Sequence, residues 1–126
     1  MRKEIENWWK QGKNDLEKAK FLFMNKNFDG ASFFSQQAVE KALKALILLK
    51  TKERSIEGHS LVHLGKLAGV PQSFFSDLKK LSPQYVISRY PDITEDVPYE
   101  LYDENVTREF VNIAKEVLAW IEKQLQ

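Results

Sequence analysis

Apolar residues recur every three or four positions along most of this 126-residue chain, which is the spacing of amphipathic α-helices. No segment shows the strict alternation of apolar and polar residues that predicts a half-buried strand. The sequence therefore predicts an all-α fold, an up-and-down bundle of four or five helices, as one domain over residues 1–126. The expected helices cover residues 4–24, 30–50, 60–68, a segment carrying Phe74 to Leu81, and 105–125.

Capping and helix-breaking residues mark the ends of these helices. We expect Asp29 to be the N-cap of the second helix, because its carboxylate can accept from the open N–H groups of the first turn. Pro71 suits the first turn of the fourth helix, and Pro83 marks its end or a kink. Residues 88–104 contain two prolines and six acidic residues, and we expect them to form a loop.

Composition excludes several classes of protein. Cysteine is absent, which excludes a disulfide framework, a thiolate nucleophile and a cysteine-bound metal. No apolar run approaches the ~18 residues of a membrane-spanning helix, and no apolar signal segment opens the sequence. We therefore expect a cytoplasmic protein, and no motif predicts a cofactor or a metal site.

The net charge of +1 conceals an uneven distribution. Residues 1–54 carry 12 basic and 7 acidic residues, whereas residues 55–126 carry 7 basic and 11 acidic residues. This balance argues against general affinity for nucleic acid, which needs a basic footprint over the whole domain. Charge alone favours solvated helix faces of mixed sign, with a basic face that meets an anion as the alternative.

Adjacent aromatic residues occur at three places, Trp8-Trp9, Phe33-Phe34 and Phe74-Phe75. Neighbouring side chains on a helix point about 100° apart, so one ring of each pair can face the core and the other must lie at its boundary. The pairs indicate either one wide apolar face or a second apolar surface that is buried in a symmetric dimer.

Two polar groups are candidates for a binding site. Gln37, Glu40, Lys41 and Lys44 lie within two turns of the second helix, and Glu40 and Lys44 have the i, i+4 spacing of an ion pair. Spacing alone favours a surface ion pair. The alternative is a polar seam with two lysines available for phosphate.

The second group is the run Ser88-Arg89-Tyr90-Pro91-Asp92. Arginine offers a planar fork of donors for phosphate, a tyrosine ring can stack on a base, and Asp92 can orient Arg89. Pro91 pushes Tyr90 out of helical geometry, which predicts a stiff loop. The alternative is a structural Arg–Asp pair that pins this loop to the bundle.

These motifs resemble the HEPN domain family, named for higher eukaryotes and prokaryotes nucleotide-binding. The resemblance covers nearly the whole chain, in three blocks. The first block is Trp8-Trp9, followed by Asp15-Leu16 and residues 28–31. The second block is residues 37–45, followed by His59-Ser60-Leu61. The third block is residues 88–92, which contain the RYPD motif, followed by Tyr99, Tyr102 and the last helix.

The resemblance implies a bundle of four or five helices that dimerises through its longest helices. Many members are metal-independent ribonucleases, often toxins, with an Arg and a His that are separated by four to six residues near the start of the final helix. Other members lack this motif and bind nucleotides or act as partner proteins. Prokaryotic members often form a complex with a small nucleotidyltransferase.

The sequence departs from the nuclease pattern. Arg89 is followed at those offsets by Thr94, Glu95 and Asp96, and no His follows His63. Cleavage through the 2′-hydroxyl needs a group that exchanges protons near neutral pH, which histidine does and arginine does not.

One literal match, Arg54 with His59, lies before the third helix, which is the wrong place for the family's site. We expect His59 to cap that helix together with Ser60. His63 is expected to pack beside Leu64 and Leu67.

The sequence therefore predicts a non-catalytic HEPN-type module that dimerises and binds a nucleotide, or that partners a nucleotidyltransferase in a toxin–antitoxin-like context. The expected contacts are Lys41, Lys44 and Arg89 to phosphate and Tyr90 to the base, with Gln37, Glu40 and Asp92 orienting them. The alternative is an endoribonuclease toxin that uses Arg89 with a carboxylate, or Arg54 with His59. A structural dimer that binds only protein is a third interpretation.

Overall fold

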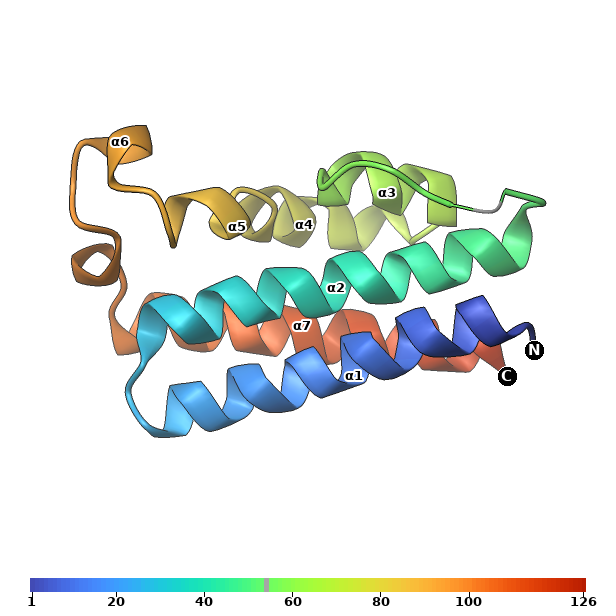
Figure 1. Cartoon of the computed structure of the whole chain (residues 1–126), viewed down its shortest axis with the longest axis horizontal. Coiled ribbons are helices and arrows are strands. Elements are labelled where there is room, and N and C mark those ends of the chain that lie inside the picture. Colours follow the sequence, from blue (N-terminus) through green and yellow to red (C-terminus); the bar gives the residue numbers. More distant parts are fainter. Residues whose placement is uncertain (54) are drawn as a thin grey trace.

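Helix α2 is the centre of the molecule, and the other long helices pack around it (Figure 1). The computed structural model describes residues 1–53 and 55–126, and all of their regular structure is helical, which confirms the all-α bundle. The elements are α1 (Lys3–Met24), α2 (Phe28–Lys50), α3 (Leu61–Ala68), the 3₁₀ turn η1 (Gln72–Phe74), α4 (Phe75–Leu81), α5 (Gln84–Ile87), α6 (Pro91–Thr94), η2 (Pro98–Leu101) and α7 (Glu104–Leu125).

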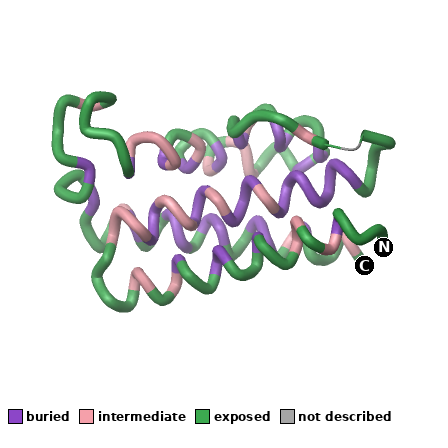
Figure 2. The backbone as a smooth tube through the Cα atoms, viewed as in Figure 1, coloured by how far each residue is buried: buried purple, intermediate pink, exposed green. Residues whose placement is uncertain are grey.

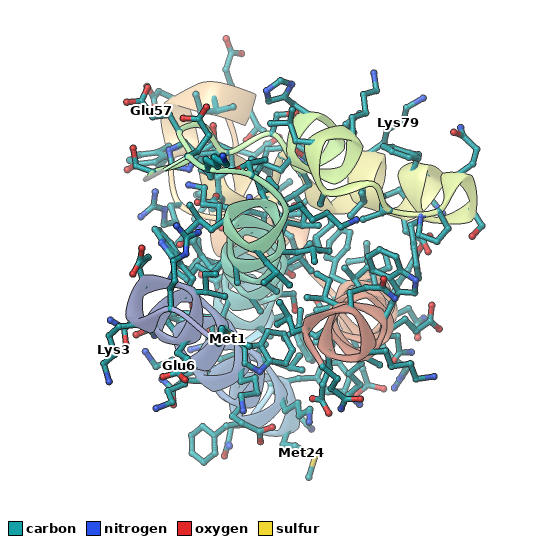
Figure 3. The ribbon with its side chains drawn as sticks, turned by 90° about the vertical axis from the view of Figure 1, so that its right-hand side faces the viewer. Met1, Lys3, Glu6, Met24, Glu57 and Lys79 are labelled. Atoms are coloured by element: carbon teal, nitrogen blue, oxygen red, sulfur yellow. The ribbon has the colours of Figure 1, made fainter. Side chains whose placement is uncertain are left out.

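The chain runs up and down along the long axis of the molecule. Helices α1, α2 and α7 are the long rods, and α3, α4 and α5 form a shorter layer beside α2 (Figure 1). In the view along the axis, α1, α2 and α7 lie at the corners of a triangle (Figure 3). The two termini meet at one end, and α6 and η2 lie at the opposite end (Figure 1).

Burial is concentrated on α2 and on the inner faces of α1 and α7 (Figure 2). Leu43, Leu46 and Leu64 have no exposed surface, and they belong to one apolar cluster that also takes in α4 and α7. Full burial of a leucine side chain stabilises the fold by about 1.5–3 kcal/mol relative to an exposed one. The apolar stripes seen in the sequence are therefore the core.

A glycine lets α1 approach α2 closely. A Cβ atom at Gly12 would lie 3.1 Å from the carbonyl oxygen of Ala38 and 3.2 Å from the amide nitrogen of Ala42. These neighbours are backbone atoms, which a rotamer change cannot move away. Gly12 therefore fits a point where the narrow alanine stripe of α2 allows two helix backbones to approach.

The start of α2 differs from the expectation. Asn27, not Asp29, is the N-cap, and its side chain accepts from the amide of Gly30 at 3.1 Å. Asp29 lies in the first turn, where its charge is favourable to the positive end of the helix. Both residue types are good N-caps, so the sequence alone did not separate them.

Residues 88–104 do not form one loop, so the expectation of a loop over this range is wrong. They contain α6 and η2, and each of these begins with a proline whose fixed φ and missing N–H suit a first turn. Helix α4 ends at Leu81 before Pro83, as predicted, and Pro83 then caps the additional short helix α5.

His63 was expected to pack beside Leu64 and Leu67, and the structure leaves His63 and Leu67 exposed while Leu64 is buried. Helix α3 turns Leu61, Leu64 and Ala68 inward instead. His63 and Leu67 are four residues apart and share the opposite face. Ser60 does cap α3, because its hydroxyl accepts from the amide of His63 at 3.2 Å.

Candidate functional site

One face of α2 carries Gln37, Glu40 and Lys44 of the first predicted group, whereas Lys41 turns from beside this face to Asp15 of α1. Phe33, Gln37, Glu40 and Lys44 follow one another at spacings of four, three and four residues, so they share a face of the helix. We call this face the α2 seam. It lies between α1 on one side and α5 on the other, both of which pack against α2.

Glu40 is the centre of the seam. The residue is 4% exposed, and its carboxylate accepts from Lys44 Nζ at 3.1 Å and from Gln36 Nε2 at 3.3 Å. The ring Nδ1 of His59 lies 3.0 Å from Glu40 Oε1. Gln37 adds to the network by donating to Gln36 Oε1 at 2.8 Å. Glu40 and Lys44 are both buried, so the interpretation of a surface ion pair is wrong.

Both lysines of this group turn towards α1. Lys44 Nζ lies 5.3 Å from the ring centroid of Trp8, and Lys41 binds the carboxylate of Asp15. Asp15 is 1% exposed and also accepts from Gln11 Nε2 at 3.0 Å. Each lysine therefore has a buried carboxylate partner, and a phosphate at this place would have to share or replace that partner.

The second predicted group stands at the end of α5. Tyr90 is extended, with φ −118° and ψ 110°, as the proline after it predicted. Arg89 Cζ lies 4.5 Å from the ring centroid of Phe33 and 5.0 Å from that of Tyr90, and its Nε donates to the carbonyl of Tyr85 at 3.0 Å. Arg89 is thus held by rings and a carbonyl.

The predicted partner of Arg89 does not pair with it. Within residues 1–53 and 55–126, no carboxylate lies within 4.0 Å of the Arg89 guanidinium. Asp92 is exposed in the first turn of α6. The structural Arg–Asp pair is therefore not formed, and an orienting role for Asp92 stays a prediction.

His59 and Tyr85 join the two groups. The ring of His59 packs on the ring of Tyr85, with centroids 4.9 Å apart and planes inclined by 34°. Because His59 also contacts Glu40, and Tyr85 accepts from Arg89, one row of contacts runs from Lys44 to Arg89. His59 therefore belongs to this row as well as standing beside the cap of α3.

A buried hydrogen-bond network holds α5, and with it Arg89, in place. Tyr102 Oη donates to Gln84 Oε1, and Gln84 Nε2 donates to the carbonyl of Lys80 at 3.1 Å. Burial, with a smaller contribution from the carboxylate of Asp29, raises the pKa of the Tyr102 phenol well above its ordinary value. The phenol is therefore neutral and a donor at physiological pH.

Sequence reasoning missed three members of this site, Asp15, Gln36 and Tyr85. Asp15 had a signal, because it stands at helical spacing on the stripe of Ile5, Gly12 and Ala19 and is buried with them. An acid on an apolar stripe indicates a buried partner. Tyr85 had no local signal, since its role depends on a contact with a distant segment.

Neither a metal centre nor a membrane span was found in the described part of the chain. Within residues 1–53 and 55–126, no group of three or more His, Cys, Asp or Glu side chains is arranged to hold a metal ion. No described helix has the length and apolar character to cross a bilayer. Arg54, one half of the literal Arg–His match, lies outside the described residues.

The family of the chain follows from its similarity to known proteins. Residues 5–124 match the model of the HEPN domain. The chain belongs to the HEPN domain family. Among curated proteins, no sequence matches this HEPN chain.

Solved structures agree over the full length. TT1696 from Thermus thermophilus is similar with a TM-score of 0.86 and 29% identity, over 97% of this chain and 98% of its own. ST0689, an archaeal HEPN homologue, is similar with a TM-score of 0.83 and 37% sequence identity. The similarity covers 99% of this chain and 100% of ST0689. A HEPN domain protein from Thermotoga maritima is similar with a TM-score of 0.72 and 25% sequence identity. The similarity covers 94% of this chain and 97% of that protein.

Proposed function

We propose that this HEPN protein is a non-catalytic module that binds a nucleotide, acting as a homodimer or as the partner of a small nucleotidyltransferase. One observation carries the proposal. Arg89 is an exposed guanidinium without a carboxylate partner in the described chain, and it is fixed between two aromatic rings. A planar cation beside an exposed tyrosine suits a ligand with a phosphate and a base.

Each predicted residue has a role in this proposal. Arg89 pairs with a phosphate, and Tyr90, which is 46% exposed, stacks on the base. Lys44 on the α2 seam, and Lys41 beside it on the side of α1, share their carboxylate partners Glu40 and Asp15 with the phosphate. Gln37, Glu40 and Asp92 orient these groups.

The dimer and the partner protein rest on family resemblance and on the aromatic pairs. Phe33 and Phe34 are both half-buried on α2, with ring centroids 5.0 Å apart. Phe21 of α1 is 67% exposed. Aromatic side chains on the outer faces of two long helices are typical of a surface that is covered in an assembly.

A panel of nucleotides tests the proposal by thermal shift. We expect ATP, GTP or one of their mono- or diphosphates to stabilise the protein, by about 2.7 kcal/mol at 100 times its dissociation constant. Arg89→Ala removes this stabilisation. Arg108→Ala keeps it, because Arg108 is also an exposed arginine beside a ring, 5.6 Å from that of Phe23, but belongs to α7. Equal stabilisation of wild type and Arg89→Ala contradicts the site.

One observation favours a second candidate, an endoribonuclease. The side chain of His59 is 55% exposed, and a buried carboxylate on its Nδ1 leaves Nε2 towards solvent. This is how a general base is oriented in many hydrolases, and Arg89 binds the same Tyr85 that His59 packs on. Cleavage of single-stranded RNA in EDTA that is lost in both His59→Ala and Arg89→Ala establishes this candidate and overturns the non-catalytic one.

A further inference from the structure

A groove with a volume of about 550 Å³ runs between α1 and α7. Its walls come from one face of each helix, because Trp9, Lys13, Leu16 and Lys20 follow at spacings of four, three and four residues on α1. On α7, the wall is formed by Lys115, Leu118, Ala119 and Glu122. The volume lies in the range of sites for small ligands.

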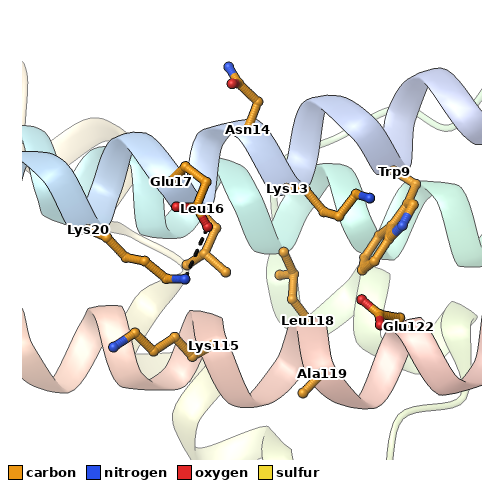
Figure 4. A pocket seen from close by; sticks show the side chains of 10 residues that line it. All are labelled: Trp9, Lys13, Asn14, Leu16, Glu17, Lys20, Lys115, Leu118, Ala119 and Glu122. Atoms are coloured by element: carbon orange, nitrogen blue, oxygen red, sulfur yellow. Dashed lines mark hydrogen bonds and ion pairs between the residues drawn. The ribbon is translucent and has the colours of Figure 1, made fainter.

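The two ends of the groove differ in chemistry (Figure 4). Lys20 and Lys115 lie together at one end, and Trp9 lies at the other above Glu122. Leu16 and Leu118, which are 8% and 4% exposed, form an apolar floor between them. The groove is therefore amphipathic along its length.

Only part of the positive charge at the basic end is neutralised by carboxylates. Lys20 Nζ donates to Glu17 Oε1 at 3.1 Å. Lys115 makes no ion pair within 4.0 Å in the ranges 1–53 and 55–126. A free ammonium next to a neutralised pair leaves one net positive charge for an anion.

The aromatic end offers a ring surface. Trp9 is half-buried, and Lys13 Nζ lies 5.5 Å from its ring centroid. Trp9 precedes Leu16 by seven residues on α1, which separates the two side chains by about 10 Å along the helix axis. That length matches two fused aromatic rings with one anionic substituent.

We propose that this groove binds a small aromatic anion, with its acidic group at Lys115 and its rings over Leu118 against Trp9. The charge complementarity at Lys115 and the apolar floor carry this assignment. The site uses none of the residues of the proposed nucleotide site, so it goes beyond that function and stands or falls separately.

Calorimetric titration of the full chain with 2-naphthalenesulfonate tests the proposal. We expect saturable binding at one site per chain. Lys115→Gln weakens binding about tenfold, the effect of losing one charge-assisted hydrogen bond. Lys123→Gln is the matched control, since Lys123 is an exposed lysine of α7 that does not line the groove, and it leaves binding unchanged. The uncharged analogue 2-naphthol binds wild type as weakly as 2-naphthalenesulfonate binds Lys115→Gln.

Two further variants keep the test decisive. Ala119→Phe adds a ring at an exposed position of the groove wall without touching the core, and it abolishes binding. Arg89→Ala leaves binding unchanged, which separates this site from the nucleotide site. Absence of binding at millimolar 2-naphthalenesulfonate, or equal binding by wild type and Lys115→Gln, overturns the proposal. Dissociation of a dimer by Ala119→Phe, without naphthalenesulfonate binding to wild type, assigns the groove to a second copy and also overturns it.

Discussion

Removal of the Lys41 ammonium destabilises the protein through Asp15. Lys41→Met keeps the apolar stem and leaves a carboxylate that is 1% exposed without its closest cation. Breaking a fully buried pair in this way costs about 3–5 kcal/mol. The Lys41 side chain is 21% exposed, Gln11 still donates to Asp15 at 3.0 Å, and Lys18 lies 3.9 Å away. These groups reduce the expected loss to about 2–3 kcal/mol.

Urea unfolding followed by tryptophan fluorescence measures this loss. Lys18→Met is the control, because the Lys18 side chain is 49% exposed and its contact with Asp15 is long, so the change is at most about 0.5 kcal/mol. Asp15→Asn in the Lys41→Met background removes the unpaired charge and recovers part of the lost stability. A fall in the free energy of unfolding of less than about 0.5 kcal/mol for Lys41→Met refutes a coupled buried pair. Additive effects of Lys41→Met and Asp15→Asn on this free energy refute it as well.

The backbone approach, the helix cap and the buried phenol each give a further prediction. Gly12→Val forces a side chain against the backbone of α2 and lowers the free energy of unfolding by about 1–3 kcal/mol in urea, whereas an unchanged value contradicts the close approach. Asn27→Ala removes the N-cap of α2 and lowers the free energy of unfolding by about 1 kcal/mol, whereas Asp29→Ala lowers it by less. Urea unfolding of the two variants checks this order. The pKa of the Tyr102 phenol is raised in the folded state, so the stability it confers is complete below pH ~10 and is lost as the pH rises above that value. Unfolding measured from pH 9 to 12 therefore shows a steeper decline for wild type than for Tyr102→Phe, and parallel curves contradict the assignment.

Periodicity was sufficient to place the long helices. The apolar stripes of α1, α2 and α7 are continuous over many turns, and each is buried as its spacing predicted. The short elements α5, α6 and η2 were missed because four residues cannot show a period. Their positions depend on prolines and on packing, of α5 and η2 against α2 and of α6 against α5.

The site was only partly predictable, for a different reason. The pairing of Glu40 with Lys44 follows from i, i+4 spacing, but its burial does not. His59 is 19 residues from Glu40 in sequence and Asp15 is 26 residues from Lys41, so tertiary packing brings both contacts together. The contact of Arg89 with Phe33 likewise depends on α5 lying beside α2.

Calorimetric titration with the nucleotide that gives the largest thermal shift decides whether Arg89 belongs to a nucleotide site. We expect saturable binding at one site per chain, weakened about tenfold or more by Arg89→Ala, weakened by added inorganic phosphate, and unchanged by Arg108→Ala. Binding is also weaker at high ionic strength, because the contact is between charges. No heat of binding at millimolar nucleotide, or equal affinity for wild type and Arg89→Ala, contradicts a nucleotide site at Arg89.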